Sequence, residues 1–165
     1  MSSSRFAPSH APDEDRQNTA GADSAMCMAS RTDVIVRLGI AGFALYFWTI
    51  AILMSVAPKF FFTHIGPFGA LNVHYIRDTA TFNAAFAAGL TVAYRRASWQ
   101  VPMLFCVTVQ FALHSINHLV DIDAAHPHWL GPADFTSLTL SAVLLAVLLA
   151  RALRPPTPPR PSVAP

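Results

Sequence analysis

The sequence has few charged residues and almost no lysine, and these scarcities exclude several classes of protein. Only 12% of the 165 residues are charged, and the basic residues are ten arginines and a single lysine, Lys59. The basic residues stand singly or in pairs, so the chain has no basic patch of the kind that follows nucleic-acid phosphates. Nucleic acid is therefore not an expected partner.

Cysteines and the common catalytic motifs are also scarce. Cys27 lies in a polar segment and Cys106 in an apolar run, which is not the pattern of a disulfide framework. The chain has no Gly-rich phosphate loop, no nucleophile elbow and no CxxC redox pair. A binding or structural protein is therefore favoured over an enzyme.

Long apolar runs are what the sequence does contain. Hydrophobic residues make up 53% of the chain, and they concentrate in four runs at about 34–57, 73–94, 99–120 and 135–153. A bilayer core of about 30 Å requires about 20 apolar residues in a helix, which is the length of these runs. The prediction is an all-α protein whose residues 33–153 form a four-helix transmembrane bundle with up-down-up-down topology.

The segments outside the bundle have a different composition. Residues 1–32 are rich in Ser, Ala, Pro and Asp, which predicts a disordered tail, and residues 154–165 form a proline-rich tail. The loop after Pro58 contains Lys59 and three phenylalanines, Phe60 to Phe62, and is expected at the membrane interface with its phenylalanines in lipid.

The distribution of basic residues predicts the orientation of the bundle. One side contains Arg31, Arg37, Arg95, Arg96, Arg151, Arg154 and Arg160. The other side has Lys59 and Arg77. Because cytoplasmic loops carry the excess of Arg and Lys, both termini are predicted to be cytoplasmic, and loops 58–72 and 121–134 then face outward. The lipid bilayer is the expected partner, and a membrane-protein partner or a second copy of the chain is left open.

Ionisable residues gather where the third run approaches its outer end, in residues 110–123. His114 and His118 are spaced i, i+4, and His74 and Asp78 near the start of the second run have the same spacing. Each pair shares one helix face, and the two pairs fall at similar depths. If the two faces meet, the polar groups converge. The candidate site residues are His74, Arg77, Asp78, His114, His118 and Asp121.

Three interpretations of this cluster remain open. In the first, the polar groups, with Asn83 and Asn117, only hold the helices together. The second is a metal site, for a divalent transition metal or for a haem b with one histidine from each helix. Its ligands would be His74, Asp78, His114 and His118. In the third, the cluster binds a small polar or quinone-like molecule or transfers protons.

The second run also resembles a known family. Arg77 and Asp78 at its start, the stretch FNAAFAAGL and the pair Arg95 and Arg96 at its end are similar to the DoxX-like group of small four-helix membrane proteins. The resemblance covers about residues 34–153 and implies a four-helix bundle in the bacterial inner membrane, with a link to redox or quinone-related systems. Among site residues, it carries over only Arg77 and Asp78.

Overall fold

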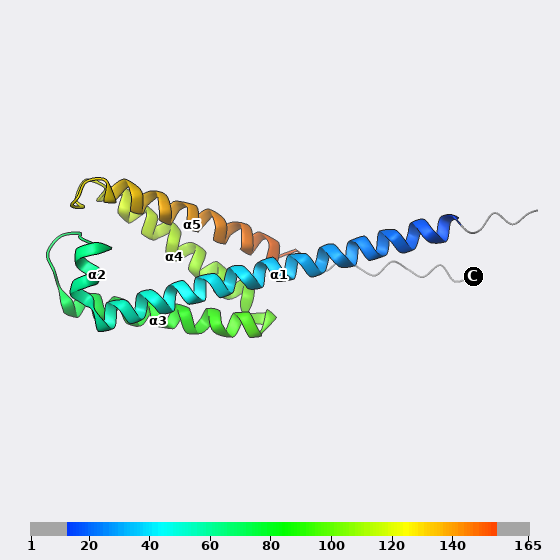
Figure 1. Ribbon diagram of the computed structural model, residues 1–165, viewed down its shortest axis with the longest axis horizontal. Coiled ribbons are helices and arrows are strands. Elements are labelled where there is room, and N and C mark those ends of the chain that lie inside the picture. Colours follow the sequence, from blue (N-terminus) through cyan, green and yellow to red (C-terminus); the bar gives the residue numbers. More distant parts are fainter. Residues whose placement is uncertain (1–12, 155–165) are drawn as a thin grey trace, which may run out of the picture. The chain divides into compact units, whose positions relative to one another are not determined.

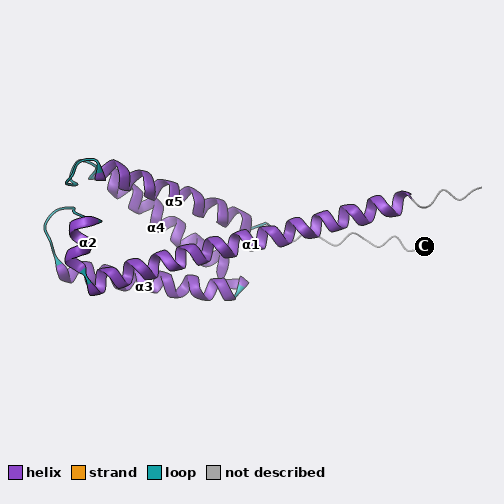
Figure 2. Ribbon diagram, in the orientation of Figure 1, coloured by secondary structure: helices purple, strands orange, loops and turns teal. Residues whose placement is uncertain are grey.

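The computed structural model describes the backbone of residues 13–154 and the side chains of residues 34–154. This part of the chain is all-α, with five α-helices and a short 3-10 helix, Ala97–Trp99 (Figures 1 and 2). The α-helices are α1 (Asp13–Val56), α2 (Pro58–His64), α3 (Val73–Arg95), α4 (Gln100–Val120) and α5 (Leu130–Ala152). Val34–Arg154 forms one compact unit, which contains the core and the cavity described below.

Three segments within the described residues are long and apolar enough to cross a membrane. They are Val34–Val56, Ala97–Val120 and Leu130–Ala152, with 23, 24 and 23 residues. Each is longer than the about 20 residues that a bilayer core requires. The prediction of helices that are long and apolar enough to cross a membrane is thus confirmed for these three segments. The helix α3 also has 23 residues but is not among them.

The chain between the long helices is more helical than the sequence predicts. The predicted interfacial loop after Pro58 begins with α2, because a proline in the first turn has the right φ and needs no N–H partner there. The helix α5 begins at Leu130, five residues before the predicted start, since Pro132 falls in its first turn, where it is tolerated.

The helix α1 begins at Asp13, whereas composition predicts a disordered tail up to residue 32. Residues 13–33 contain no proline. They continue a helix that is already nucleated, so each added residue has only to propagate the helix. The rest of the predicted N-terminal tail, 1–12, and most of the predicted proline-rich tail, 155–165, lie outside the described residues.

The core of the unit is built where α1 packs against α3, α4 and α5. Its largest fully buried side chains are Ile40, Leu90, Leu104, Val107 and Leu145. Beside them, the Phe47 ring lies 5.4 Å from the Phe86 ring and 5.8 Å from the Phe111 ring, which joins α1 to α3 and α4. Leu148 of α5 packs on Gly39 of α1.

The polar contacts between helices are few and specific. The Trp48 indole donates to the Thr91 hydroxyl at 3.3 Å, joining α1 to α3. The hydroxyls of Ser115 and Thr139 lie 2.6 Å apart and join α4 to α5. The helices α4 and α5 run side by side, whereas α3 and α4 meet at the 3-10 helix and diverge toward the end that carries α2 (Figure 1). This divergence leaves room for a cavity at that end.

Candidate functional site

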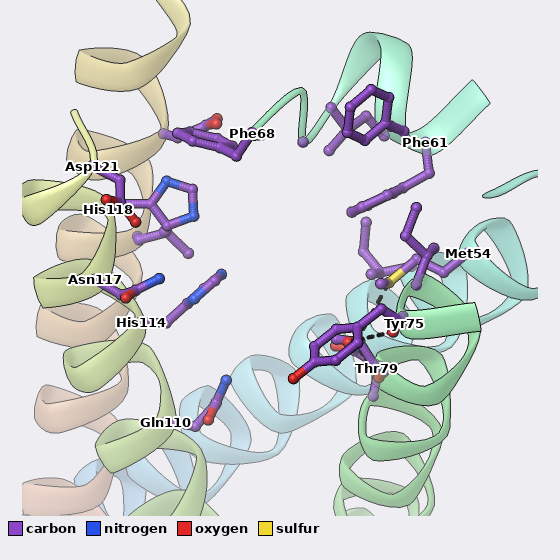
Figure 3. Close-up of a pocket in the computed structure, with 18 of the residues that line it drawn as sticks. Met54, Phe61, Phe68, Tyr75, Thr79, Gln110, His114, Asn117, His118 and Asp121 are labelled. Atoms are coloured by element: carbon purple, nitrogen blue, oxygen red, sulfur yellow. Dashed lines mark hydrogen bonds between the residues drawn. The ribbon is translucent and has the colours of Figure 1, made fainter. Parts of the chain in front are cut away.

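A cavity of about 660 Å³ lies at the end of the unit where α3 and α4 have diverged. All five α-helices contribute to its lining, together with the loop 65–72. The helix α4 and the residue after it contribute five of its polar side chains, and every α-helix except α5 contributes aromatic ones (Figure 3). The volume is within the range of about 300–1,000 Å³ that is typical of small-molecule sites.

One wall of the cavity is a polar stripe along α4, continued by the residue after the helix. The spacings of three and four residues place these side chains on one face, because α-helical residues so spaced are neighbours. The stripe consists of Gln110, His114, Asn117, His118 and Asp121. Figure 3 shows Gln110, His114 and Asn117 reaching from α4 toward the cavity. Each of these side chains can form hydrogen bonds, so the wall can recognise polar atoms of a ligand.

The two histidines of the stripe lie edge to face. The ring centroids of His114 and His118 are 4.7 Å apart with an interplanar angle of 89°. The Phe68 ring of the loop packs edge-on against His118 at 4.7 Å, and the next loop holds Phe68 through a β-bridge with Ala125. The Nδ1 atom of His118 is buried and has no hydrogen-bond partner. Since buried ring nitrogens are usually paired, His118 retains unused hydrogen-bonding capacity.

The opposite wall is formed by α1 and α3. Met54, Tyr75 and Thr79 lie across the cavity from the stripe (Figure 3). The Asn83 amide donates to the Thr79 carbonyl oxygen at 2.9 Å and contacts the Met54 sulfur at 3.7 Å, so its hydrogen-bonding capacity is partly used inside the wall. Asn72 caps α3 by accepting from the Tyr75 amide at 3.1 Å, which fixes where this wall begins.

Aromatic side chains form the base and one side of the cavity. Phe47 and Phe111 belong both to the lining and to the buried core. Phe61 and Phe62 of α2 also line the cavity, although the sequence places them in lipid; of the three phenylalanines, Phe60 is the one that is 52% exposed. The cavity therefore combines one hydrogen-bonding wall with flat apolar surfaces.

The structure brings together half of the predicted site. His114, His118 and Asp121 line the cavity, as Asp134 of α5 also does. His74, Arg77 and Asp78 do not line it. The Nε2 atom of His74 and the Oδ2 atom of Asp78 instead lie 3.3 Å apart, and the two side chains are 85% and 57% exposed. The predicted meeting of the two i, i+4 pairs is therefore wrong.

The rotation of α3 explains this outcome. Ala80, Ala87 and Leu90 are buried, so the face of α3 that contains them packs inward, and the face of His74 and Asp78 turns away. The four predicted metal ligands are consequently not assembled. Within residues 34–154, no group of three or more His, Cys, Asp or Glu is arranged to hold a metal ion.

The interpretation that the cluster only holds helices together is supported for one residue. Asn83 of α3 contacts Met54 of α1, as that interpretation requires. In the described part of the chain, the side-chain hydrogen bonds between long helices otherwise join Trp48 to Thr91 and Ser115 to Thr139, and do not use the histidines of the stripe.

Sequence reasoning missed the residues that face the stripe. Tyr75 and Thr79 gave no signal of their own, because their role depends on the rotation of α3, for which the small residues Ala80 and Ala87 are the only sequence clue. Asp134 falls in a loop of the predicted fold, and its position in the cavity follows from the early start of α5.

Comparison of the chain with protein-family models, with curated proteins and with solved structures gives no match. The resemblance to the DoxX-like group therefore stays a prediction.

Proposed function

We propose that this protein is a four-helix integral membrane protein that binds a small amphipathic molecule with a quinone-like head group in the cavity between α1, α3 and α4. The observation that carries the proposal is the composition of the cavity, which sets the polar stripe of α4 opposite aromatic and apolar surfaces. In this proposal the protein binds its ligand and catalyses no reaction on it.

The proposed bundle uses α3 as the fourth crossing, in an up-down-up-down arrangement. With 23 residues, α3 has a length of about 34 Å, at about 1.5 Å per residue, enough for a bilayer core. Its contacts support this role: Phe86 and Thr91 pack on α1, and Ala80, Ala87 and Leu90 are buried. Its charged residues lie in its first turns and at its last residue, Arg95, where a crossing helix meets the two membrane interfaces.

The proposed orientation has both termini in the cytoplasm of a bacterial cell, with the protein in the inner membrane. The Arg37 guanidinium lies 5.1 Å from the centroid of the Tyr94 ring, so Arg37 is at the same end of the unit as Arg95 and Arg96. Arg151, in the last turn of α5, is at this end as well. Leu148, one turn before it, packs on Gly39 of α1, which is close to Arg37. A basic end is typical of the cytoplasmic side, which leaves the cavity near the outer side.

The chemistry of the lining supports a flat head group with polar atoms at its edge. The side chains of Gln110, His114 and Asn117 can donate to carbonyl oxygens, while Phe47 and Phe111 offer ring surfaces. A purely polar ligand would leave the aromatic surfaces unused. A purely apolar one would leave the stripe without hydrogen bonds, at a cost of about 1–3 kcal/mol for each buried unsatisfied group.

The alternative, a purely structural or assembly protein, needs the stripe to bond between helices. Within residues 34–154, the side-chain hydrogen bonds between long helices join Trp48 to Thr91, Ser115 to Thr139 and Asn83 to Met54, all outside the stripe. The stripe is therefore available to a ligand.

Binding of decylubiquinone, a short-chain benzoquinone, to the full-length protein in lipid nanodiscs tests the proposal. We expect saturable binding above empty nanodiscs, and a dissociation constant about five to ten times higher for His114→Ala, because one hydrogen bond contributes about 1 kcal/mol. His74→Ala is the matched control and should bind as the wild type does, since His74 lies outside the cavity. Equal losses in both variants, or no saturable binding, would contradict the proposal.

A further inference from the structure

The outward face of α3 carries ionisable groups that the cavity does not use. The side chains of His74 and Asp78 are 85% and 57% exposed, and Arg77 is also exposed. In the described part of the chain, Asp78 pairs with His74 of the same helix and not with Arg77. If α3 crosses the membrane, these groups face lipid near its outer end, where an uncompensated charge is costly.

The same face has a regular spacing. His74 and Asp78 are followed by residues at intervals of three, four, three and four, which is the a and d pattern of a heptad. These following residues are Thr81, Ala85, Ala88 and Val92. Thr81, Ala85 and Ala88 are exposed, and their small side chains allow a second helix to approach closely. On this repeat Asp78 is at position a, and Arg77 is at the preceding position g.

We propose that this face of α3 is the interface of a parallel homodimer, in which Arg77 of each copy pairs with the partner's Asp78. In a parallel pair of helices, a residue at position a packs against the a residue and the preceding g residue of the other helix, so the two arginines flank the two facing aspartates and neutralise them. The two-fold axis of a dimer in a membrane lies along the membrane normal, so equivalent residues of the two copies are at the same depth. The two ion pairs are then reciprocal and are formed by the same interface.

A second copy is the occupant that the charges favour. The face presents one arginine and one aspartate side by side, and a two-fold axis brings each next to the opposite charge. Lipid head groups could also approach these charges, but they do not account for small residues at the a and d positions further along α3. The inference rests on the proposed crossing of α3 and is independent of the ligand in the cavity.

Disulfide cross-linking of the full-length protein in nanodiscs or native membranes tests the interface. In a background without Cys27 and Cys106, we expect Ala85→Cys to form cross-linked dimers upon mild oxidation. The matched control is Leu140→Cys, on α5, whose position is also exposed at 65%. The yield should be about tenfold higher for Ala85→Cys, since a specific interface selects one face. Equal yields, or none at either position, would overturn the proposal.

Charge reversal provides an independent test. Arg77→Asp places two acidic residues on the face and Asp78→Arg two basic ones, so each variant alone should dimerise about tenfold less, because its copies repel. When the two variants are co-expressed with different tags, the acidic and basic faces match, and the variants should co-purify as a heterodimer. Recovery in the mixture excludes misfolding as the cause of the single-variant losses. Unchanged dimers of each variant alone, or no heterodimer in the mixture, would contradict the reciprocal pairs.

These tests separate the dimer from the proposed function. The variants Arg77→Asp and Asp78→Arg lie outside the cavity, so each should bind decylubiquinone as the wild type does. Loss of the dimer with intact binding affects only this inference. Conversely, if His114→Ala weakens ligand binding, the protein should still form cross-linked dimers through Ala85→Cys.

Discussion

Gly131 lies where the turn after α4 meets the first turn of α5, and replacing it with alanine tests how closely these segments pack. A Cβ atom at Gly131 would overlap the carbonyl oxygen of Ile122 and lie 2.9 Å from its carbonyl carbon. Carbon atoms in contact lie about 3.5–4.0 Å apart, so the backbone must move by about 0.6 Å or more. The neighbour is backbone, and therefore no side-chain rotation can relieve the clash.

The expected loss of stability follows from two opposing effects. Overpacking of this kind costs about 1–3 kcal/mol or more, whereas alanine gains at most about 1 kcal/mol over glycine in a helix. We expect Gly131→Ala to lower the free energy of unfolding by about 2 kcal/mol, which corresponds to a fall in melting temperature of about 4–8 °C. Thermal unfolding of the detergent-solubilised protein, followed by circular dichroism at 222 nm, measures this fall.

The matched control is Gly42→Ala on α1, where a Cβ atom would have no neighbour within 4 Å. This variant should be as stable as the wild type or more stable, by up to about 1 kcal/mol, because alanine is the better helix former. A Gly131→Ala variant with a melting temperature at or above that of the wild type would refute the close approach of Ile122.

Two further predictions concern helix packing and orientation. Ser115→Ala should lower the free energy of unfolding by about 1 kcal/mol, since it removes the 2.6 Å contact between α4 and α5. Thr49→Ala, the control, loses only a hydrogen bond to its own helix and should lower it less. Equal losses in a thermal-unfolding assay would contradict this account. A cysteine replacing the exposed His126 should react with a membrane-impermeant maleimide in intact cells, because the loop between α4 and α5 is proposed to face outward. Labelling of this cysteine only from the cytoplasmic side would reverse the orientation.

The positions of the long helices could be predicted from the sequence, because apolar length is a local property. The predicted 73–94 and 99–120 agree closely with α3 and α4, whose bounds are Val73–Arg95 and Gln100–Val120. The polar stripe could be predicted as well, because the i, i+4 spacing of His114 and His118 places them on one face of any helix. Their position in the cavity is what the structure adds.

The other half of the site could not be predicted, because it depends on the rotation of one helix. Whether α3 turns His74 and Asp78 or Tyr75 and Thr79 toward α4 depends on how Ala80 and Ala87 pack, which is a tertiary property. The same is true of α2, whose seven residues form a helix beside the cavity although the segment reads as a loop. Sequence periodicity shows which residues share a face of a helix, but it does not show which other helix packs against that face.

The central claim is that a quinone-like molecule occupies the cavity next to the polar stripe, and photolabelling tests it most directly. A short-chain azidobenzoquinone is bound to the full-length protein in nanodiscs and activated by light, and the labelled residues are identified by mass spectrometry. The account predicts labels on cavity-lining residues of α4 or α3, such as His114 or Tyr75, that excess decylubiquinone suppresses. Labels spread over exposed positions of α5 such as Leu140 and Val143, with no competition by decylubiquinone, would contradict it.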